Sequence, residues 1–334
     1  MPQPILASSS TPDEELLFTS LRAGEWDDFY GQEEVKQSLR IAIQAAKERK
    51  EPLDHALFYG PPGLGKTTLS LLIAKELGVQ VKLTSGTALT KAGDVAALLT
   101  NLQPGDIVFI DEIHRLPKAV EETLYPAMED CALDIMIGKG PGARTLRLEL
   151  PPFTLVGATT RFGLLAGPFR DRFGLIHRIE LYQPEVLANI LSNTAKRLNI
   201  AIENDAALEI SRRSRGTPRI AIKLLKRVRD VAQVNGTSLI ELAAVHSALQ
   251  MFNIDSLGLG DLDRQFLEQI IHKHKGGPVG LSTIAALLNE DPLTIEEVFE
   301  PFLLQAGLVK RTPKGRVVTQ LAYNHLGLPF SDTV

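Results

Sequence analysis

The residues from Gly60 to Thr67 have the types and spacing of a phosphate-binding loop, G-x-x-x-x-G-K-[ST]. Glycines let the backbone close around a phosphate with its N–H groups pointing inward. Lys66 can reach the β- and γ-phosphates of a nucleotide, and the Thr67 hydroxyl can ligate Mg²⁺. A chance glycine-rich turn is the alternative. The apolar run Ala56–Tyr59 before the loop and the helical pattern Thr68–Leu77 after it favour the nucleotide site.

Two adjacent acids, Asp111 and Glu112, follow the apolar run Ile107–Ile110. Ligands of open α/β sheets bind at the carboxyl edge, where such a strand would end. Asp111 would then hold Mg²⁺ through water, and Glu112 would orient and polarise the attacking water. A solvated acidic turn is common, but the phosphate loop upstream favours the catalytic interpretation. A metabolite kinase does not require Glu112, whereas an ATP hydrolase does.

Hydroxyl groups end a third apolar run, Thr154–Arg161, and would place Thr160 beside the γ-phosphate. Turn hydrogen bonds explain the same pattern equally well. Further on, Arg170 and Arg172 flank Asp171. One arginine could pair with Asp171, while the other could reach a neighbouring subunit's γ-phosphate and offset charge in the transition state. A surface cluster fits this spacing as well.

A fifth motif, Arg215-Gly216-Thr217-Pro218-Arg219, has the features of a helix start. Thr217 suits the N-cap and Pro218 the first helical position. Arg219 then lies in the first turn, where a cation opposes the helix dipole. A nearby phosphate would relieve that cost, so the motif favours a phosphate-sensing role.

The pattern of apolar runs divides the chain into three parts. Five runs predict strands of a doubly wound parallel α/β sheet; they are His55–Tyr59, Gln80–Leu83, Asp106–Ile110, Phe153–Gly157 and Leu175–Leu181. Residues 183–252 lack strand signals and predict a small all-α domain. Residues 262–326 predict three helices followed by a two-stranded ribbon.

The ribbon in the last part has a basic tip. Helices are expected at Leu281–Leu288 and at Leu293–Ala306, the second with Thr294 as its cap. The flanking ribbon has four cations and no acid: Lys310, Arg311, Lys314 and Arg316. Helix, helix and basic hairpin form a winged-helix pattern whose cations suit DNA phosphates without sequence preference. The acids Glu296, Glu297 and Glu300 argue against deep major-groove insertion, and a protein-contact winged helix is the alternative.

The charge balance supports this division. The 334 residues carry a net charge of −4, which taken alone argues weakly against nucleic acid. By segment the net charge is −5 for residues 1–181, +3 for 182–255 and −2 for 256–334. The single cysteine, Cys131, excludes an intrachain disulfide and fits a reducing cytoplasm. With no spanning apolar stretch and no signal-peptide pattern, we expect a cytoplasmic protein without membrane contact.

Together these motifs closely resemble the RuvB family of bacterial Holliday junction branch migration ATPases. The resemblance runs from about Leu21 to Leu328 and includes the motifs GATTR at 157–161, DRFG at 171–174 and RTPKGR at 311–316. It implies an α/β AAA+ P-loop domain at 21–181, a small all-α lid at 182–254 and a winged-helix head at 255–334. The residues before them, 1–20, have the composition of a mobile tail. The resemblance also implies a hexameric ring on duplex DNA that hydrolyses ATP to ADP and phosphate during recombination and repair, with RuvA, and with RuvC at resolution.

The resemblance also assigns roles to residues. It implies ATP and Mg²⁺ contacts at Gly60, Gly63, Gly65, Lys66, Thr67, Thr68 and Asp111, water activation at Glu112, and sensors at Thr160 and Arg219. Arg172 matches the trans-acting arginine finger. Leu21, Arg22, Tyr182 and the Glu129-Asp130-Cys131 region would lie near the nucleotide, and Arg311 and Arg316, with Lys310 and Lys314, would contact DNA. The segment Leu133–Leu150, with its Gly138–Gly142 turn, is similar to the hairpin that docks on RuvA, although an ordinary packed hairpin has the same pattern.

Three positions depart from the family pattern: Ala23 replaces a proline, Tyr30 an aliphatic residue and Phe169 a leucine. The first two concern the adenine pocket. A nucleotide-gated DNA-binding regulator or loader without translocation remains the alternative function, because Glu112 permits hydrolysis in both.

Overall fold

The computed structural model describes residues 15, 18–137 and 144–330. The chain forms two compact units, one spanning Ser20–Tyr182 and the other comprising Met1–Thr19 and Gln183–Val334. The predicted tail at 1–20 lies mostly outside the described residues, and Phe18–Ser20 at its end are helical.

A five-stranded parallel sheet forms the centre of the first unit. Its strand order is β2-β3-β6-β1-β7. The strands are β1 (Ala56–Tyr59), β2 (Val81–Ser85), β3 (Ile107–Asp111), β6 (Thr154–Thr159) and β7 (Leu175–Arg178). The prediction of an α/β parallel sheet is confirmed, although the strand ends differ by one to three residues. The central strands β1, β3 and β6 are buried along almost their whole length because helices cover both of their faces.

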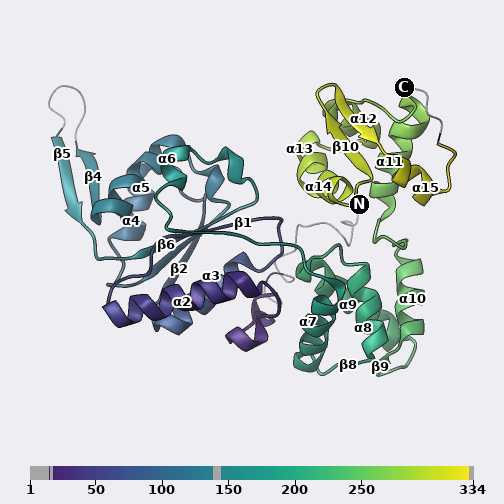
Figure 1. Cartoon of the computed structure of the whole chain (residues 1–334), viewed down its shortest axis with the longest axis horizontal. Coiled ribbons are helices and arrows are strands. Elements are labelled where there is room, and N and C mark those ends of the chain that lie inside the picture. Colours follow the sequence, from purple (N-terminus) through teal and green to yellow (C-terminus); the bar gives the residue numbers. More distant parts are fainter. Residues whose placement is uncertain (1–14, 16–17, 138–143, 331–334) are drawn as a thin grey trace. The chain divides into compact units, whose positions relative to one another are not determined.

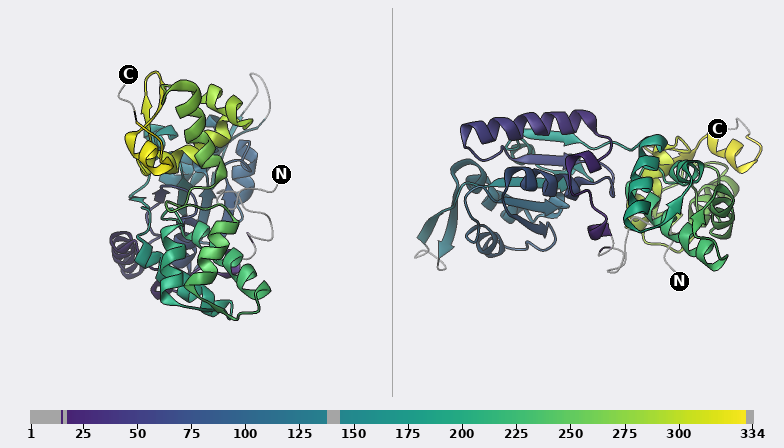
Figure 2. Two further views of the ribbon diagram at one scale, coloured as in Figure 1. Left: turned by 90° about the vertical axis from the view of Figure 1, so that its right-hand side faces the viewer. Right: turned by 90° about the horizontal axis from the view of Figure 1, so that it is seen from below.

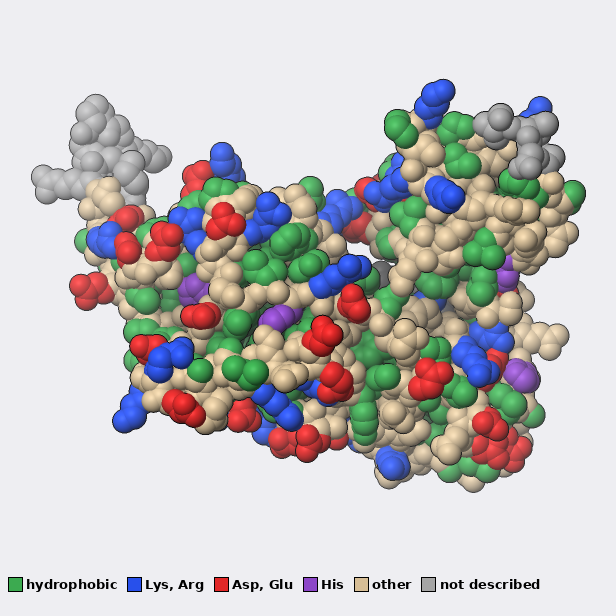
Figure 3. Space-filling view, viewed as in Figure 1, with side chains coloured by type: hydrophobic (Ala, Val, Ile, Leu, Met, Phe, Trp, Pro, Cys, Tyr) green, Lys and Arg blue, Asp and Glu red, His purple; other side chains and the backbone are tan. Residues whose placement is uncertain are grey.

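Helices α2 (Glu33–Arg49) and α3 (Lys66–Leu77) cover one face of the sheet, and α4 (Ala92–Leu99), α5 (Lys118–Asp130) and α6 (Gly167–Arg170) cover the other (Figures 1 and 2). Helix α3 begins two residues earlier than predicted, directly after Gly65. Short 3₁₀ turns lie at η1 (Trp26–Asp28), η2 (Ile113–Arg115) and η4 (Phe162–Leu164). On the face shown in Figure 3, acidic and basic side chains are interspersed over this unit.

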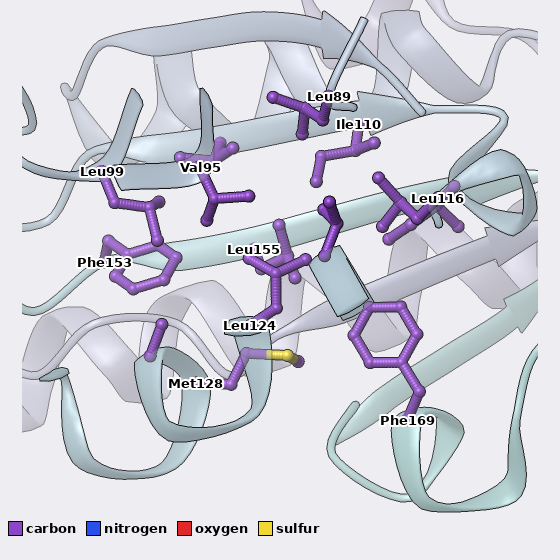
Figure 4. Close-up of a cluster of buried hydrophobic side chains, with 14 of the residues drawn as sticks. Leu89, Val95, Leu99, Ile110, Leu116, Leu124, Met128, Phe153, Leu155 and Phe169 are labelled. Atoms are coloured by element: carbon purple, nitrogen blue, oxygen red, sulfur yellow. The ribbon is translucent and has the colours of Figure 1, made fainter. Parts of the chain in front are cut away.

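The core on the α4–α5–α6 side fixes the ends of the strands that carry the predicted acids. Val95 and Leu99 from α4 and Leu124 and Met128 from α5 belong to one buried cluster, and Phe169 is fully buried in the same cluster (Figure 4). Leucine at position 169 would fill less of this space than the phenylalanine present, so the departure from the family pattern concerns packing.

A hairpin of β4 (Ala132–Ile137) and β5 (Arg144–Glu149) projects from this unit (Figure 1). Leu148 pairs with buried Leu133 and packs on the core, whereas Leu146 is 45% exposed. The hairpin predicted within Leu133–Leu150 is therefore present, and β5 is packed on the core at Leu148 and exposed at Leu146. The predicted Gly138–Gly142 turn lies outside the described residues.

The second unit begins with four helices: α7 (Pro184–Arg197), α8 (Asn204–Arg212), α9 (Pro218–Val234) and α10 (Leu242–Met251). The expectation of no strands between 183 and 252 was wrong in one detail. Two-residue strands β8 (Ala201–Ile202) and β9 (Leu239–Ile240) pair in parallel. Two residues are too few to show a periodicity of two, so the pattern could not indicate them.

The same unit continues as a winged helix. Its elements are α11 (Asp261–His274), α12 (Leu281–Leu288), α13 (Pro292–Thr294), the π-helical η5 (Ile295–Phe299), α14 (Glu300–Gln305), β10 (Val309–Thr312), β11 (Gly315–Val318) and α15 (Gln320–Leu326). Helix α15 was not predicted. Thr294 was wrongly predicted as a cap: the Asp291 side chain accepts from the N–H groups of Leu293 and Thr294 at 2.8 and 3.2 Å. Among the described residues no helix is both long and apolar enough to cross a membrane.

Candidate nucleotide site and basic wing

The loop from Gly60 to Gly65 joins β1 to α3 and has the backbone that only glycine adopts easily. Gly60, Gly63 and Gly65 have φ values of +145°, +80° and +97°. A Cβ at Gly60 would lie 2.3 Å from the carbonyl oxygen of Ile179. Gly65 is the N-cap of α3, so Thr67 and Thr68 lie in its first turn, where N–H groups and the helix dipole favour an anion.

Lys66 is folded back onto the same loop. Its side-chain Nζ donates to the carbonyl oxygens of Gly60 and Pro61, both at 2.8 Å, and the residue is buried. Neutral carbonyls satisfy a buried ammonium less well than a phosphate does, because charge-assisted bonds are stronger. The loop therefore holds its cation where an arriving phosphate would be favoured.

The strand β3 ends at Asp111, and the backbone turns sharply at Glu112. The Asp111 Oδ1 accepts from the N–H of Glu112 at 3.0 Å. Glu112 itself has a φ of +47°, uncommon for a residue with a side chain. A Cβ at Gly86 would lie 2.4 Å from the Glu112 carbonyl oxygen, so glycine there permits the turn.

The end of β6 connects the loop to this acid. The N–H of Gly60 donates to the carbonyl of Thr159 at 3.1 Å, and the Thr160 hydroxyl donates to Glu112 Oε2 at 3.2 Å. His114 Nδ1 lies 2.9 Å from the Thr159 hydroxyl and 3.2 Å from the same Glu112 oxygen. The structure thus brings the loop, Thr160 and Glu112 together. Sequence reasoning did not single out His114 or Thr159; their only signal was adjacency to the predicted residues.

Aromatic side chains flank the loop. The buried Tyr182 hydroxyl donates to the carbonyl of Leu64 at 3.0 Å, and burial raises the pKa of Tyr182 well above its usual range. A Cβ at Gly65 would lie 3.0 Å from the Phe29 ring. The Gln32 side chain donates to the Glu180 carbonyl at 2.7 Å and accepts from its N–H at 3.2 Å, fastening this segment. Sequence reasoning missed Phe29; the half-buried residues it did name in this segment are Leu21, Arg22, Ala23 and Tyr30.

Arg172 lies against α5, and the two arginines of its motif have separate contacts. Arg172 Nη2 is 3.1 Å from Glu129 Oε1, and its Nη1 donates to the Pro168 carbonyl at 2.5 Å. Its guanidinium also stacks 4.2 Å from the Tyr125 ring, while Arg170 stacks 5.1 Å from the Phe162 ring instead.

The three residues at the end of α5 have different surroundings. Glu129 reaches Arg172, as above, with 56% of its side chain exposed. Asp130 pairs with Arg147 of β5 at 2.7 Å, which anchors the hairpin. Cys131 ends the helix in the left-handed conformation, with φ +50°. The structure therefore brings Glu129 to the predicted finger and directs Asp130 to the hairpin.

Arg219 lies in the second unit, in the first turn of α9. Thr217 is the N-cap position and Pro218 the first helical residue, as predicted. The expected cap bond is absent from this helix start: the Thr217 hydroxyl donates instead to the carbonyl of Arg215 at 3.2 Å. The Arg219 guanidinium lies 5.8 Å from the Phe18 ring.

The basic ribbon β10–β11 lies against α14. Lys310 and Lys314 are exposed, but the guanidinium groups of Arg311 and Arg316 both bind Glu300. Glu300, one of the three acids that argue against deep major-groove insertion, has a fully buried side chain. The basic ribbon contains no acidic residue in its own sequence, but in the folded chain two of its cations bind the carboxylate of Glu300.

Comparison with known proteins covers almost the whole chain. Three family models match in order: the Holliday junction DNA helicase RuvB P-loop domain at residues 21–179, the RuvB AAA lid domain at 182–255 and the RuvB C-terminal winged helix domain at 256–327.

Solved structures agree with these models. The Thermotoga maritima RuvB Holliday junction branch migration motor is 49% identical, with 93% of this chain and 99% of that chain covered and a TM-score of 0.85. One single-residue mutant of Thermotoga maritima RuvB is 49% identical, with 93% of this chain and 100% of that chain covered and a TM-score of 0.86. A second single-residue mutant is 48% identical, with 93% of this chain and 99% of that chain covered and a TM-score of 0.84.

Proposed function

We propose that this chain, which belongs to the RuvB family of AAA+ ATPases and Holliday junction branch migration motors, converts ATP to ADP and phosphate and uses the energy to move junction arms. The observation that carries the proposal is the chain of contacts from Gly60 through Thr159 and Thr160 to Glu112. It connects a phosphate loop to an ionisable base, as hydrolysis by an activated water needs.

The nucleotide phosphates would lie on the N–H groups of the loop and at the start of α3. Lys66 would exchange the two carbonyls that it now binds for phosphate oxygens. Glu112 would accept the proton of the attacking water, with Thr160 fixing its carboxylate through the 3.2 Å hydrogen bond. Phe29 and Tyr182 would line the adenine side of the loop.

Two residues of the first unit have side chains that suit Mg²⁺. The Thr67 hydroxyl and the Asp111 carboxylate are hard oxygen donors, and Mg²⁺ commonly uses one or two protein ligands together with phosphates and water. Asp111 uses one carboxylate oxygen for the Glu112 N–H, which orients the other. When bound, Mg²⁺ would offset the negative charge of the phosphates.

Arg172 would complete the site of a neighbouring subunit in a hexameric ring. Its ion-pair partner Glu129 is more than half exposed, so that pair adds little to the cost of release; the hydrogen bond to Pro168 and the stacking on Tyr125 also have to break. The Glu129-Asp130-Cys131 region would then lie at the nucleotide interface between subunits.

Arg219 would contact the phosphates from the second unit. Different contacts with ATP and ADP would change the position of the lid, residues 182–254, and with it the head, residues 255–334. The tail and large domain would occupy residues 1–20 and 21–181.

DNA arms would lie against the basic wing, which includes Lys310 and Lys314. Few phosphate contacts per subunit give weak individual binding, and a ring multiplies them by effective concentration. The hairpin at 133–150, with Leu146 exposed on β5, is the surface that we assign to RuvA; RuvC would join at resolution.

Branch migration of a synthetic four-way junction, measured with and without RuvA, tests this function. We expect ATP-dependent strand movement, and we expect Glu112→Gln to bind ATP without moving strands. ATP-dependent DNA binding without strand movement would favour the regulator or loader instead.

A further inference from the structure

One buried carboxylate holds both wing arginines. Glu300 Oε1 accepts from the Nε of Arg311 at 2.9 Å and the Nε of Arg316 at 2.8 Å. Its Oε2 accepts from the Nη2 of each, at 2.8 and 3.0 Å. Burial alone would raise the pKa of Glu300, but its hydrogen bonds to Arg316 and Arg311 outweigh burial and hold that pKa below its usual value. The carboxylate is therefore ionised.

The two arginines need such a partner because they stand opposite each other. Arg311 and Arg316 are paired residues of the antiparallel ribbon. Like charges at directly opposed positions repel, and without a shared anion the two side chains would separate. Glu300 places both planar groups edge-on to one carboxylate, which fixes their orientation as well as their positions.

The bonds to Glu300 use only one edge of each guanidinium. They occupy the Nε and Nη2 nitrogens, so Nη1 with its two hydrogens lies outside the pair in both residues. The Arg311 side chain is 51% exposed and that of Arg316 is 16% exposed. The nitrogens that Glu300 does not use can therefore bind a ligand without breaking the bonds to Glu300, and the more exposed Arg311 is the more accessible of the two.

We propose that Glu300 is a positioning residue for DNA binding: it touches no DNA but orients Arg311 and Arg316 so that their outward N–H donors meet backbone phosphates. The inference rests on the proposed DNA-binding role of the wing. Side chains that are already ordered lose less conformational entropy on binding, so affinity is gained although one negative charge is added.

Two hypotheses about Glu300 predict opposite effects on DNA affinity: that it positions the arginines, or that it only lowers the net charge of the wing. Glu300→Gln removes a negative charge from beside the wing, so charge counting predicts tighter DNA binding and a steeper salt dependence. Positioning predicts the reverse, since the arginines lose their anchor. We expect the Kd for a fluorescein-labelled duplex, measured by anisotropy on the full chain, to rise roughly fivefold to tenfold. The slope of log K against log salt should fall by about one.

Glu296→Gln is the matched control. It removes the same charge from the same helical run, and its carboxylate lies 3.8 Å from Arg311 Nη2, beyond hydrogen-bond distance. We expect equal or slightly tighter DNA binding. If both variants tighten binding alike, charge alone matters and the inference is wrong.

Arg311→Lys covers the case in which Glu300→Gln does not fold. Lysine keeps the charge at a half-exposed position but cannot donate two parallel bonds to one carboxylate. Positioning predicts weaker binding, and an unchanged Kd and salt slope would overturn it. If the unsubstituted chain shows no salt-dependent binding to the duplex, the proposed function itself fails, which is a separate result.

Discussion

Arg172 in the first unit was predicted to act on the nucleotide of a neighbouring subunit, and Arg311 and Arg316 in the winged helix were predicted to bind DNA. In the structure all three arginines bind carboxylates of their own chain. The two arrangements differ in strength. Arg172 has one contact to a carboxylate, that of Glu129, whose side chain is 56% exposed, and its other contacts are to the Pro168 carbonyl and the Tyr125 ring. Arg311 and Arg316 donate four hydrogen bonds to Glu300, whose side chain is fully buried.

This difference implies different ways of working. Ion pairs with a largely exposed partner contribute about 0–1 kcal/mol, so the Glu129 carboxylate does not hold Arg172 in place; the Pro168 hydrogen bond and the Tyr125 stacking are the other contacts that it has to leave. Breaking a buried pair by removing one partner costs about 3–5 kcal/mol. In the proposed function, the wing arginines would therefore bind DNA with the edges that Glu300 leaves, whereas Arg172 would have to leave Glu129 to act.

Arg172→Ala should give the largest effect. We expect ATP binding to persist and hydrolysis to fall by about 10³–10⁵-fold, because the guanidinium offsets charge only in the transition state. Steady-state phosphate release and equilibrium nucleotide binding measure the two quantities separately.

Mixed rings sharpen this prediction. Arg172→Ala subunits retain the loop, and Lys66→Ala subunits retain the finger, so mixing them should restore part of the turnover. Mixed rings that assemble but stay inactive would contradict action between subunits. Full activity of Arg172→Ala alone would contradict any role for Arg172.

The second unit contains an even more enclosed pair, Arg215 with Asp263, which extends the comparison. The side chains are 4% and 3% exposed, and Arg215 Nε also donates to the Gly258 carbonyl at 2.8 Å. The Arg215 guanidinium stacks 4.7 Å from the Phe302 ring of α14. These contacts join the loop before α9 to the winged helix within this unit.

Arg215→Ala should therefore destabilise this unit by about 3–5 kcal/mol, because it leaves Asp263 buried without its cation. Urea unfolding followed by circular dichroism measures the loss. Arg227→Ala, on a pair with Asp230 whose side chains are 44% and 42% exposed, should change stability by less than about 1 kcal/mol. Equal effects of the two substitutions would remove the distinction between buried and exposed pairs.

Local sequence patterns predicted the elements that position the nucleotide site. The loop glycines were identifiable because their backbone requirement is local, and Asp111 and Glu112 because they end an apolar run. The partners were not, since they depend on tertiary contacts. Gln32 and Glu180 are 148 residues apart in the chain, and nothing near either residue indicates the other.

The wing shows the same limit over a short separation. Glu300 is 11 residues from Arg311, yet nothing in the sequence around either residue indicates that the two side chains bind each other. Its burial depends on how α14 packs against the ribbon. The positions of the cations were predictable from sequence, and their orientation was not.

The pH dependence of stability is a smaller effect, because protonating Glu300 weakens its bonds without removing the side chain. The bonds from Arg316 and Arg311 hold the pKa of Glu300 below its ordinary 4.5. The carboxylate therefore stabilises the folded state fully above pH 4.5, and this contribution is lost as the pH falls through the lower folded value.

Urea unfolding of the full chain and of Glu300→Gln at several pH values measures this effect. The difference in the free energy of unfolding between the two should shrink below pH 4.5. A difference that is constant or grows as the pH falls would mean that the carboxylate is not ionised in the folded state.

Glu129→Gln should have the smallest effect and tests the weak side of the comparison. If the contact with Arg172 is only a resting place, removing its charge changes turnover by less than about fivefold, and upward if release of the arginine limits the rate. Asp130→Asn is the neighbouring control, because Asp130 binds Arg147 of the hairpin rather than Arg172. A loss of hydrolysis in Glu129→Gln comparable to that in Arg172→Ala would show that the pair acts as a unit. Arg172 would then resemble the wing arginines, fixed by a carboxylate that it cannot leave.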